Sequence, residues 1–258
     1  SPQCDCRTKS RSSRAAGPGS AERTWPELIA RTVETYGGLH VLVNNAGIAI
    51  VADIEQTTTQ QWRDTLRVHL DGTFFGCHHA IPAMRESGGG SIVNMSSTAA
   101  LVGIAPYLAY SAAKGGIRSM TKSIAAHCKA QGLPIRCNSV HPGSIHTPMV
   151  EHALSTLAGV DLAGAENPEA MRRALGIGEP LDVANMVLFL ASDESKHVNG
   201  AEFVVDNADT VAAGERQRVR ARQRQLQQLR HLARVLRDAR LPQGDRRRAH
   251  QHTRSGGR

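Results

Sequence analysis

Tyr110 and Lys114 stand four residues apart, and together their side chains could move a proton. On a helix, residues at this spacing lie on the same face. A phenol titrates at about pH 10 and is a poor base at neutral pH, but an ammonium about 4 Å away favours the phenolate by roughly 4 kcal/mol, or about 3 pKa units. The pair therefore predicts a general acid–base centre in which Lys114 lowers the pKa of Tyr110.

The tyrosine–lysine spacing alone is a weak signal, because such pairs also occur as neighbouring groups on helix surfaces. Its weight comes from three polar segments that are each expected to end a strand: NNAG at 44–47, NMSS at 94–97 and NSVHPGSIHT at 138–147. The carboxyl ends of parallel strands meet at one edge of a sheet, where ligands bind. We expect these segments and the start of the Tyr110 helix to form one site. Tyr107 does not qualify, since Ser111 follows it at the lysine position.

The elements that would position these residues alternate along the chain. Helices are expected at residues 25–36, 60–86, 110–131 and 180–192. Strands are expected at LHVLVNNAG (39–47), SIVNMSS (91–97), IRCNSV (135–140) and AEFVVD (201–206). This alternation predicts an α/β fold with a doubly wound, Rossmann-like parallel sheet.

The sequence also predicts which parts of these elements are buried. The first strand is expected to be buried on both faces, as in the middle of a parallel sheet. The apolar stripe of the 60–86 helix is expected to consist of Trp62, Leu66, Leu70, Phe74 and Ile81. Residues 148–178 follow a strand end with Pro, Gly and short helical fragments, and they are expected to form a lid. A surface insertion without a role is the alternative.

Taken in order, the motifs resemble the short-chain dehydrogenase/reductase family. They are NNAG, the serine 13 positions before the tyrosine, YxxxK, PG-x-I-x-T, and GEPLDVANMVLFLASDES followed by VNGAEFVVD. The resemblance covers residues 25–207 and is strongest to members that act on secondary alcohols and ketones, including hydroxysteroid and cyclic-alcohol dehydrogenases. It implies an oxidoreductase that transfers a hydride between NAD or NADP and such a substrate.

The resemblance also implies roles for individual residues. Tyr110 would be the general acid–base and Ser97 would hydrogen-bond the reacting oxygen, while Lys114 would support Tyr110; Tyr110 and Lys114 would also contact the cofactor. The remaining cofactor contacts would be Asn44, Ala46 and Gly47 on the ribose side, and Ile145 and Thr147 at the nicotinamide amide. Each residue also has a simpler reading: Asn44 as a turn former, Thr147 as a helix cap and Ser97 as a strand-end residue. No metal ligand set is expected.

His69 is the first departure from the family pattern. The family usually has Asn at this position in VHLDG, and its main-chain carbonyl holds a water molecule of a proton relay. A main-chain group survives substitution, so His69 is retained as the fourth catalytic position. The imidazole either titrates or, as the simpler reading, packs on the helix face beside Leu70.

The second departure concerns the cofactor phosphates. A glycine-rich turn after a first strand is expected in this fold, but the residues before Asn44 contain one expected helix and AAGPGSAE, which follows no strand. We therefore expect an N-terminally truncated domain at 25–207, after a disordered basic arm at 1–24. A catalytically impaired remnant that acts only through oligomerisation is the alternative function.

The positive charge of the chain is concentrated at its ends. The net charge is +8, whereas residues 214–258 carry 14 Arg, no Lys and 3 acidic residues, and residues 24–213 are net acidic. Nucleic acid is therefore not an expected partner of the domain. The 208–258 tail is expected to be disordered or helical. Its composition is typical of GC-rich DNA read out of frame; a basic amphipathic binding helix is the alternative, with its leucines at Leu226, Leu229, Leu232 and Leu236.

The remaining expectations concern environment and assembly. Five cysteines without zinc or redox spacing favour a reducing compartment, and no apolar run approaches a membrane span, so a cytoplasmic protein is expected. In the family, helices equivalent to 60–86 and 110–131 pair across a two-fold axis. The chain is accordingly expected to form a homodimer or homotetramer.

Overall fold

Four parallel strands form the sheet of this protein, whose computed structural model describes residues 20–212. Their order is β1-β2-β3-β4, and each neighbouring pair is parallel. The strands are β1 (Val41–Asn44), β2 (Gly90–Met95), β3 (Ile135–Pro142) and β4 (Glu202–Val205). The predicted doubly wound, Rossmann-like parallel sheet is confirmed.

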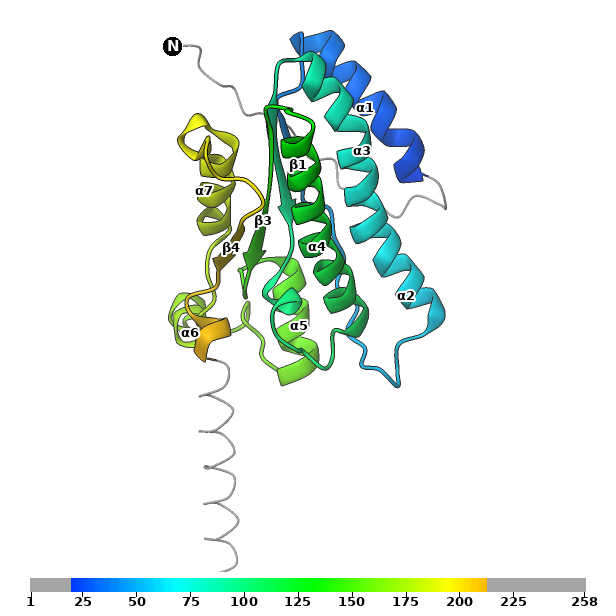
Figure 1. The fold of residues 1–258 in the computed structure, drawn as a ribbon. Helices are drawn as coiled ribbons and strands as arrows, with labels where there is room; N and C mark the ends of the chain where they lie inside the picture. The colour runs from blue at the N-terminus through cyan, green and yellow to red at the C-terminus, as the bar shows by residue number, and fades with distance from the viewer. Residues whose placement is uncertain (1–19, 213–258) are drawn as a thin grey trace, which may run out of the picture. The chain divides into compact units, whose positions relative to one another are not determined.

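Helices cover both faces of the sheet and its carboxyl edge. In Figure 1, α1, α3 and α4 lie on one face and α7 lies on the other, while α5 and α6 lie beyond the strand arrowheads. The helices are α1 (Ser20–Tyr36), α2 (Thr59–Leu66), α3 (Gly72–Glu86), α4 (Leu108–Ala130), α5 (Pro148–Ala158), α6 (Pro168–Leu175) and α7 (Pro180–Ala191). A π-turn, Arg67–Asp71, joins α2 to α3.

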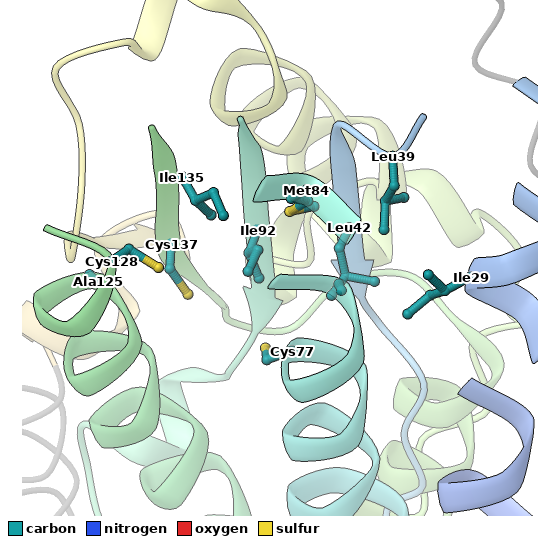
Figure 2. Packing of buried hydrophobic residues seen from close by; sticks show 11 residues of the cluster. Ile29, Leu39, Leu42, Cys77, Met84, Ile92, Ala125, Cys128, Ile135 and Cys137 are labelled. Carbon is teal, nitrogen blue, oxygen red and sulfur yellow. The ribbon is translucent and has the colours of Figure 1, made fainter. Parts of the chain in front are cut away.

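The core lies in two layers, one on each face of the sheet. Neighbouring residues of a strand point to opposite faces, so Ile92 packs towards α1, α3 and α4, whereas Val93 packs towards α7. Figure 2 shows the larger layer between the strands and the helices. Its fully buried members include Cys77, Met84 and Ile135. The two layers hold the carboxyl ends of the strands in a fixed frame.

The first strand is not buried on both faces as predicted. Val41 is 39% exposed and Val43 is 37% exposed, whereas Leu42 and Asn44 are buried. Among the described residues β1 is an edge strand, and α7 packs on β2, β3 and β4. One face of β1 consequently has no helix over it.

The helix predicted at 60–86 is interrupted, and its predicted apolar stripe is only partly correct, because Ile81 packs against the core whereas two other members are exposed. The π-turn inserts an extra residue into the ladder and changes which side chains face inward. Trp62 and Phe74 are exposed, whereas Thr65, His69 and Thr73 are buried. Small and polar residues therefore make the inward face, which allows α2 and the π-turn to lie close to α4.

The predicted end of the N-terminal arm differs from the structure, and most of the predicted C-terminal tail lies outside the described residues. The arm predicted at 1–24 is partly wrong, because α1 begins at Ser20. Residues 1–19 and 213–258 lie outside the described residues, so the basic tail and its leucine pattern have no structural account. The compact unit that contains the sheet ends at Thr210.

Residues 148–178 form two short helices rather than irregular chain. Each begins with a capping residue followed by proline, Thr147 before α5 and Asn167 before α6, and each ends at a glycine with positive φ, Gly159 or Gly176. Neither helix contains a buried residue. Such weakly packed helices at the carboxyl edge of a sheet are suited to move over a site.

Ala208 adopts a left-handed backbone conformation just after β4, with φ at 65°. This conformation strains a residue with a Cβ atom, and glycine adopts it freely. We expect Ala208→Gly to raise the free energy of unfolding by about 0.5–1 kcal/mol in urea titrations. The matched control, Ala126→Gly at an exposed position inside α4, should lower it by about 1 kcal/mol. Destabilisation by Ala208→Gly would contradict the assignment of strain.

Candidate active site

Ser97, Tyr110 and Lys114 come together at the carboxyl end of β2. Ser97 follows the strand and caps a short 3-10 helix, and its Oγ accepts a hydrogen bond from the Ala99 main-chain N–H at 3.1 Å. Tyr110 lies in the first turn of α4, near enough to the Ser97 side chain for Ser97 to act on the pKa of its hydroxyl in the lowering direction. Lys114, one turn later, is buried, and its Nζ lies 5.5 Å from the centre of the Tyr110 ring. The three predicted catalytic side chains therefore lie close to one another.

Lys114 does not lower the pKa of Tyr110 in this arrangement, so that prediction is wrong here. Its Nζ donates to the Met95 carbonyl at 2.6 Å and lies over the Tyr110 ring. Burial raises the pKa of Tyr110, and only Ser97 acts in the opposite direction. Burial also lowers the pKa of Lys114 to about 8. The site therefore holds a neutral phenol beside a lysine that titrates near neutral pH.

His69 lies in the same cluster, and it is buried there. It lies on the π-turn, is 1% exposed, and its ring meets the Tyr110 ring edge-on with centres 5.2 Å apart. Its Nε2 is 2.7 Å from the Ile48 carbonyl oxygen. Burial and the nearby Lys114 charge lower the pKa of His69 to about 4, so the imidazole is neutral near pH 7.

In the NNAG segment the Asn44 side chain is buried, whereas the residues that follow it are exposed. Asn44 donates from Nδ2 to Asn94 Oδ1 at 2.8 Å and to Cys77 Sγ at 3.4 Å, which ties β1 to β2 and α3. Ala46 and Gly47 are exposed at the strand end. A Cβ at Gly47 would lie 2.5 Å from His69 Cε1, so this position admits only glycine while His69 occupies its place. Of the predicted ribose-side residues, Ala46 and Gly47 are accessible, whereas the Asn44 amide is used within the core.

Ile145 and Thr147 follow β3 and lead into the lid helices. Ile145 is buried and pairs with Gly178, while Thr147 caps α5 by accepting a hydrogen bond from the Val150 N–H at 3.4 Å. The capping role proposed as the simpler reading of Thr147 is thus present. Ile145 and Thr147, the predicted nicotinamide contacts, therefore lie where the loop after β3 enters α5.

Comparisons with known proteins agree with this geometry. A family model described as enoyl-(acyl carrier protein) reductase matches residues 20–207. An NADP-dependent (R)-specific alcohol dehydrogenase of Lentilactobacillus kefiri is 46% identical over 195 residues, which is 74% of each chain. A 3-beta-hydroxysteroid dehydrogenase of Comamonas testosteroni is 38% identical over 189 residues, 73% of each chain. The crystal structure of a levodione reductase superposes with a TM-score of 0.66 at 30% identity and covers 74% of each chain.

The chain belongs to the short-chain dehydrogenase/reductase family. The predicted resemblance is therefore confirmed. Its motifs occupy the strand ends of this short-chain dehydrogenase/reductase in the order that the sequence indicated.

His141 is a residue of this dehydrogenase/reductase site that sequence reasoning missed. It is fully buried behind Ser97, with Nδ1 3.2 Å from the Ser97 carbonyl oxygen and Nε2 2.9 Å from Ser139 Oγ. Ser96 adds a second connection, because its Oγ donates to the Lys114 carbonyl at 2.9 Å. These two contacts hold β3 and α4 against the segment that contains Ser96 and Ser97. The available signal was a histidine next to the end of a predicted strand, in the NSVHPGSIHT segment.

The lid of this dehydrogenase/reductase is tied to the strand-end loop by charged groups. His146 lies between Ile145 and Thr147, and its Nε2 is 2.8 Å from Glu151 of α5. Arg172 of α6 pairs with Glu179 at 3.3 Å. These exposed pairs are individually weak, so they orient the lid helices without locking them.

Residues 20–212 contain no group of three His, Cys, Asp or Glu side chains placed to hold a metal ion. Within the same residues, no helix is both long and apolar enough to cross a membrane.

Proposed function

We propose that this chain interconverts secondary alcohols and ketones with NAD(P), using Ser97, Tyr110 and Lys114. The observation that carries the proposal is the placement of Ser97, Tyr110 and the buried Lys114 together at the carboxyl end of the sheet, with the Lys114 Nζ over the Tyr110 ring. The two similar enzymes named above are alcohol and hydroxysteroid dehydrogenases, which supports the same substrate class here.

The described residues fit the nicotinamide side of such a cofactor. The exposed Ala46–Gly47 backbone lies next to the site, and the absence of a side chain at Gly47 lets the main chain pass close to the His69 ring. We propose Ala46, Gly47, Ile145 and Thr147, with Tyr110 and Lys114, as the residues that hold this half. When bound, the nicotinamide supplies the hydride acceptor or donor.

The protein side chains would manage the proton. Ser97 and Tyr110 would both hydrogen-bond the substrate oxygen, which fixes it above the phenol. Because burial raises the pKa of Tyr110, the phenol is protonated and can donate its proton to a ketone oxygen as that oxygen gains charge. Lys114, with its pKa lowered to about 8, can then return a proton towards Tyr110 near physiological pH.

The lid indicates a substrate with an apolar body. Four large apolar side chains are exposed on α5 and α6: Met149, Leu157, Met171 and Leu175. A lid that carries such groups can cover an apolar ligand and exclude water from the reaction. This supports ketones with alkyl, cyclic or steroid bodies over small charged substrates.

Two measurements test the proposed function. Calorimetry with NADH and NADPH should show binding, and a panel of alkyl, cyclic and steroid ketones should oxidise the reduced cofactor. Binding without turnover of any substrate would contradict the reductase assignment. Binding of neither cofactor would favour the remnant that acts through oligomerisation. A specific observation keeps that alternative open, since in the described residues no glycine-rich turn joins a strand to a helix before β1.

We also propose a homodimer or homotetramer that forms through α2, α3 and α4. Trp62 and Phe74 are exposed on α2 and α3, which is unusual for large apolar side chains on a soluble surface. We expect self-association at micromolar concentration in sedimentation velocity. Phe74→Asp should raise the dissociation constant by about 30-fold or more, and Ile54→Asp, at an exposed loop position, should leave it unchanged. A strictly monomeric parent chain would contradict the proposal.

A further inference from the structure

The two ends of the lid, residues 148–178, are held together by main-chain hydrogen bonds. The His146 N–H donates to the Gly178 carbonyl at 2.8 Å, and the Gly178 N–H donates to the Ser144 carbonyl at 2.9 Å. Ile145 pairs with Gly178 there in a parallel bridge. The helices α5 and α6 lie between these ends, beyond the carboxyl edge of the sheet (Figure 1), and none of their residues is buried. Side chains at this fixed base therefore decide how firmly the two weakly packed helices are held.

Four side chains form a row of charged groups across this base, which we call the lid row. The His146 Nε2 lies 2.8 Å from Glu151 Oε1 in the first turn of α5, and its Nδ1 lies 3.9 Å from Glu179 Oε2. Glu179 in turn pairs with Arg172 of α6, whose Nε lies 3.3 Å from the Glu179 Oε1. The lid row therefore connects α5 to α6 through the base, in the order Glu151, His146, Glu179 and Arg172.

The charge of His146 decides whether the lid row is continuous. A neutral imidazole has a single N–H, so in either tautomer one ring nitrogen presents a lone pair to a carboxylate of Glu151 or Glu179. An imidazolium has an N–H at both nitrogens and attracts both carboxylates. Of the residue types in the row, only histidine ordinarily changes charge between about pH 5 and pH 8. Glutamates ordinarily stay ionised over this range, so acidification within it adds the contact that joins the two halves.

The charged groups next to the lid row are used elsewhere. Asp182 of α7 accepts a hydrogen bond at Oδ2 from the Glu179 N–H at 2.8 Å, in the capping box at the start of α7. This contact fixes the Glu179 main chain and adds negative charge at that end of the row. Arg173 of α6 pairs with Glu169 of the same helix, so its charge is used within α6. The two glutamates of the row therefore remain the acidic partners of His146.

We propose that His146 is a proton-controlled link of the lid, which when charged joins α5 to α6 through the lid row and when neutral leaves the row divided at Glu179. The link favours the described arrangement of both helices below the pH at which the imidazole loses its proton, and this contribution is lost as the pH rises. The groups are partly exposed, so the link changes how often the helices open and does not lock them. The proposed function gives the helices a ligand to cover, but the link itself needs neither cofactor nor substrate.

Amide hydrogen exchange of α5 and α6, in the chain without cofactor, tests the link. His146→Gln keeps a hydrogen-bond donor for Glu151 but cannot become charged. The two chains are compared with each other at about pH 5.5 and again at about pH 8, so the intrinsic pH dependence of exchange cancels. We expect both helices to exchange about threefold faster in His146→Gln at the lower pH, and at similar rates in the two chains at the higher pH.

Arg172→Met separates the link from a general effect of pH on the lid, because it removes the α6 end of the row. In this background, adding His146→Gln should speed exchange in α5 at about pH 5.5 and leave α6 unchanged. His152→Gln, at an exposed position of α5, is the matched control for the loss of a histidine. It should keep the exchange rates of the parent chain at both pH values.

Equal rates in His146→Gln and the parent chain at about pH 5.5 would overturn the proposal. An effect of His146→Gln on α6 that persists in the Arg172→Met background would also overturn it. If His146→Gln fails to fold, Arg172→Met alone decides. Its acceleration of α6 exchange, relative to the parent chain, should be larger at the lower pH than at the higher, and equal ratios would refute the link. Absence of ketone reduction leaves all these readouts intact, so failure of the proposed function is distinguishable.

Discussion

Tyr110→Phe is expected to reduce ketone reduction by about 10²- to 10⁴-fold, because it removes the phenolic oxygen that is proposed to donate the proton. The ring and its contacts with His69 remain, so far-UV circular dichroism and the thermal midpoint should change little. Oxidation of the reduced nicotinamide cofactor under saturating ketone measures the effect. Cofactor affinity, measured by calorimetry, should fall by less than the turnover.

Tyr107→Phe is the matched control for this variant. Tyr107 lies one turn earlier on the same side of the site, with its ring centre 6.0 Å from that of Tyr110. It loses the same atom but has no lysine partner, so we expect turnover within about threefold of the parent chain. Equal losses in the two variants would contradict the assignment of Tyr110 as the proton donor.

Lys114→Met is expected to change how stability depends on pH, as well as to impair turnover. Burial lowers the pKa of Lys114 from 10.5 to about 8 in the folded chain. Between these values the unfolded chain binds more protons than the folded chain, so this lysine makes stability rise with pH across that window. The parent chain should therefore gain about 3 kcal/mol relative to Lys114→Met between pH 8 and 10.5, as measured by urea unfolding.

The comparison must be made between variants at each pH, because the buried thiols act in the opposite direction. Burial raises the pKa of Cys77 to about 12 and also raises that of Cys137, so both lower stability once the unfolded thiols ionise above about pH 9. These contributions cancel in the difference between the parent chain and Lys114→Met. Lys129→Met, at an exposed position of α4, should keep the profile of the parent chain. A flat difference between pH 8 and 10.5 would show that Lys114 is not buried as described.

The sequence by itself determined the fold class and the membership of the site. Alternating apolar strands and amphipathic helices follow from periodicity that is local in the chain, so β1 to β4 and α3, α4 and α7 were predicted close to their observed positions. Segments that end parallel strands must meet at one edge of the sheet. That rule predicts that the segments containing Ser97, Tyr110 and Lys114 form one site.

Only the tertiary structure decided what each group does there. The predicted effect of Lys114 on Tyr110 did not include burial, which raises the pKa of Tyr110, while the Lys114 ammonium donates to the Met95 carbonyl, which is remote in sequence. The π-turn rotated His69 from a helix face into the centre of the site. Burial and hydrogen bonding depend on which segments lie opposite one another, and no local pattern contains that information. The sequence therefore named the acid–base residues, whereas their protonation states and the lid row emerged from three-dimensional packing.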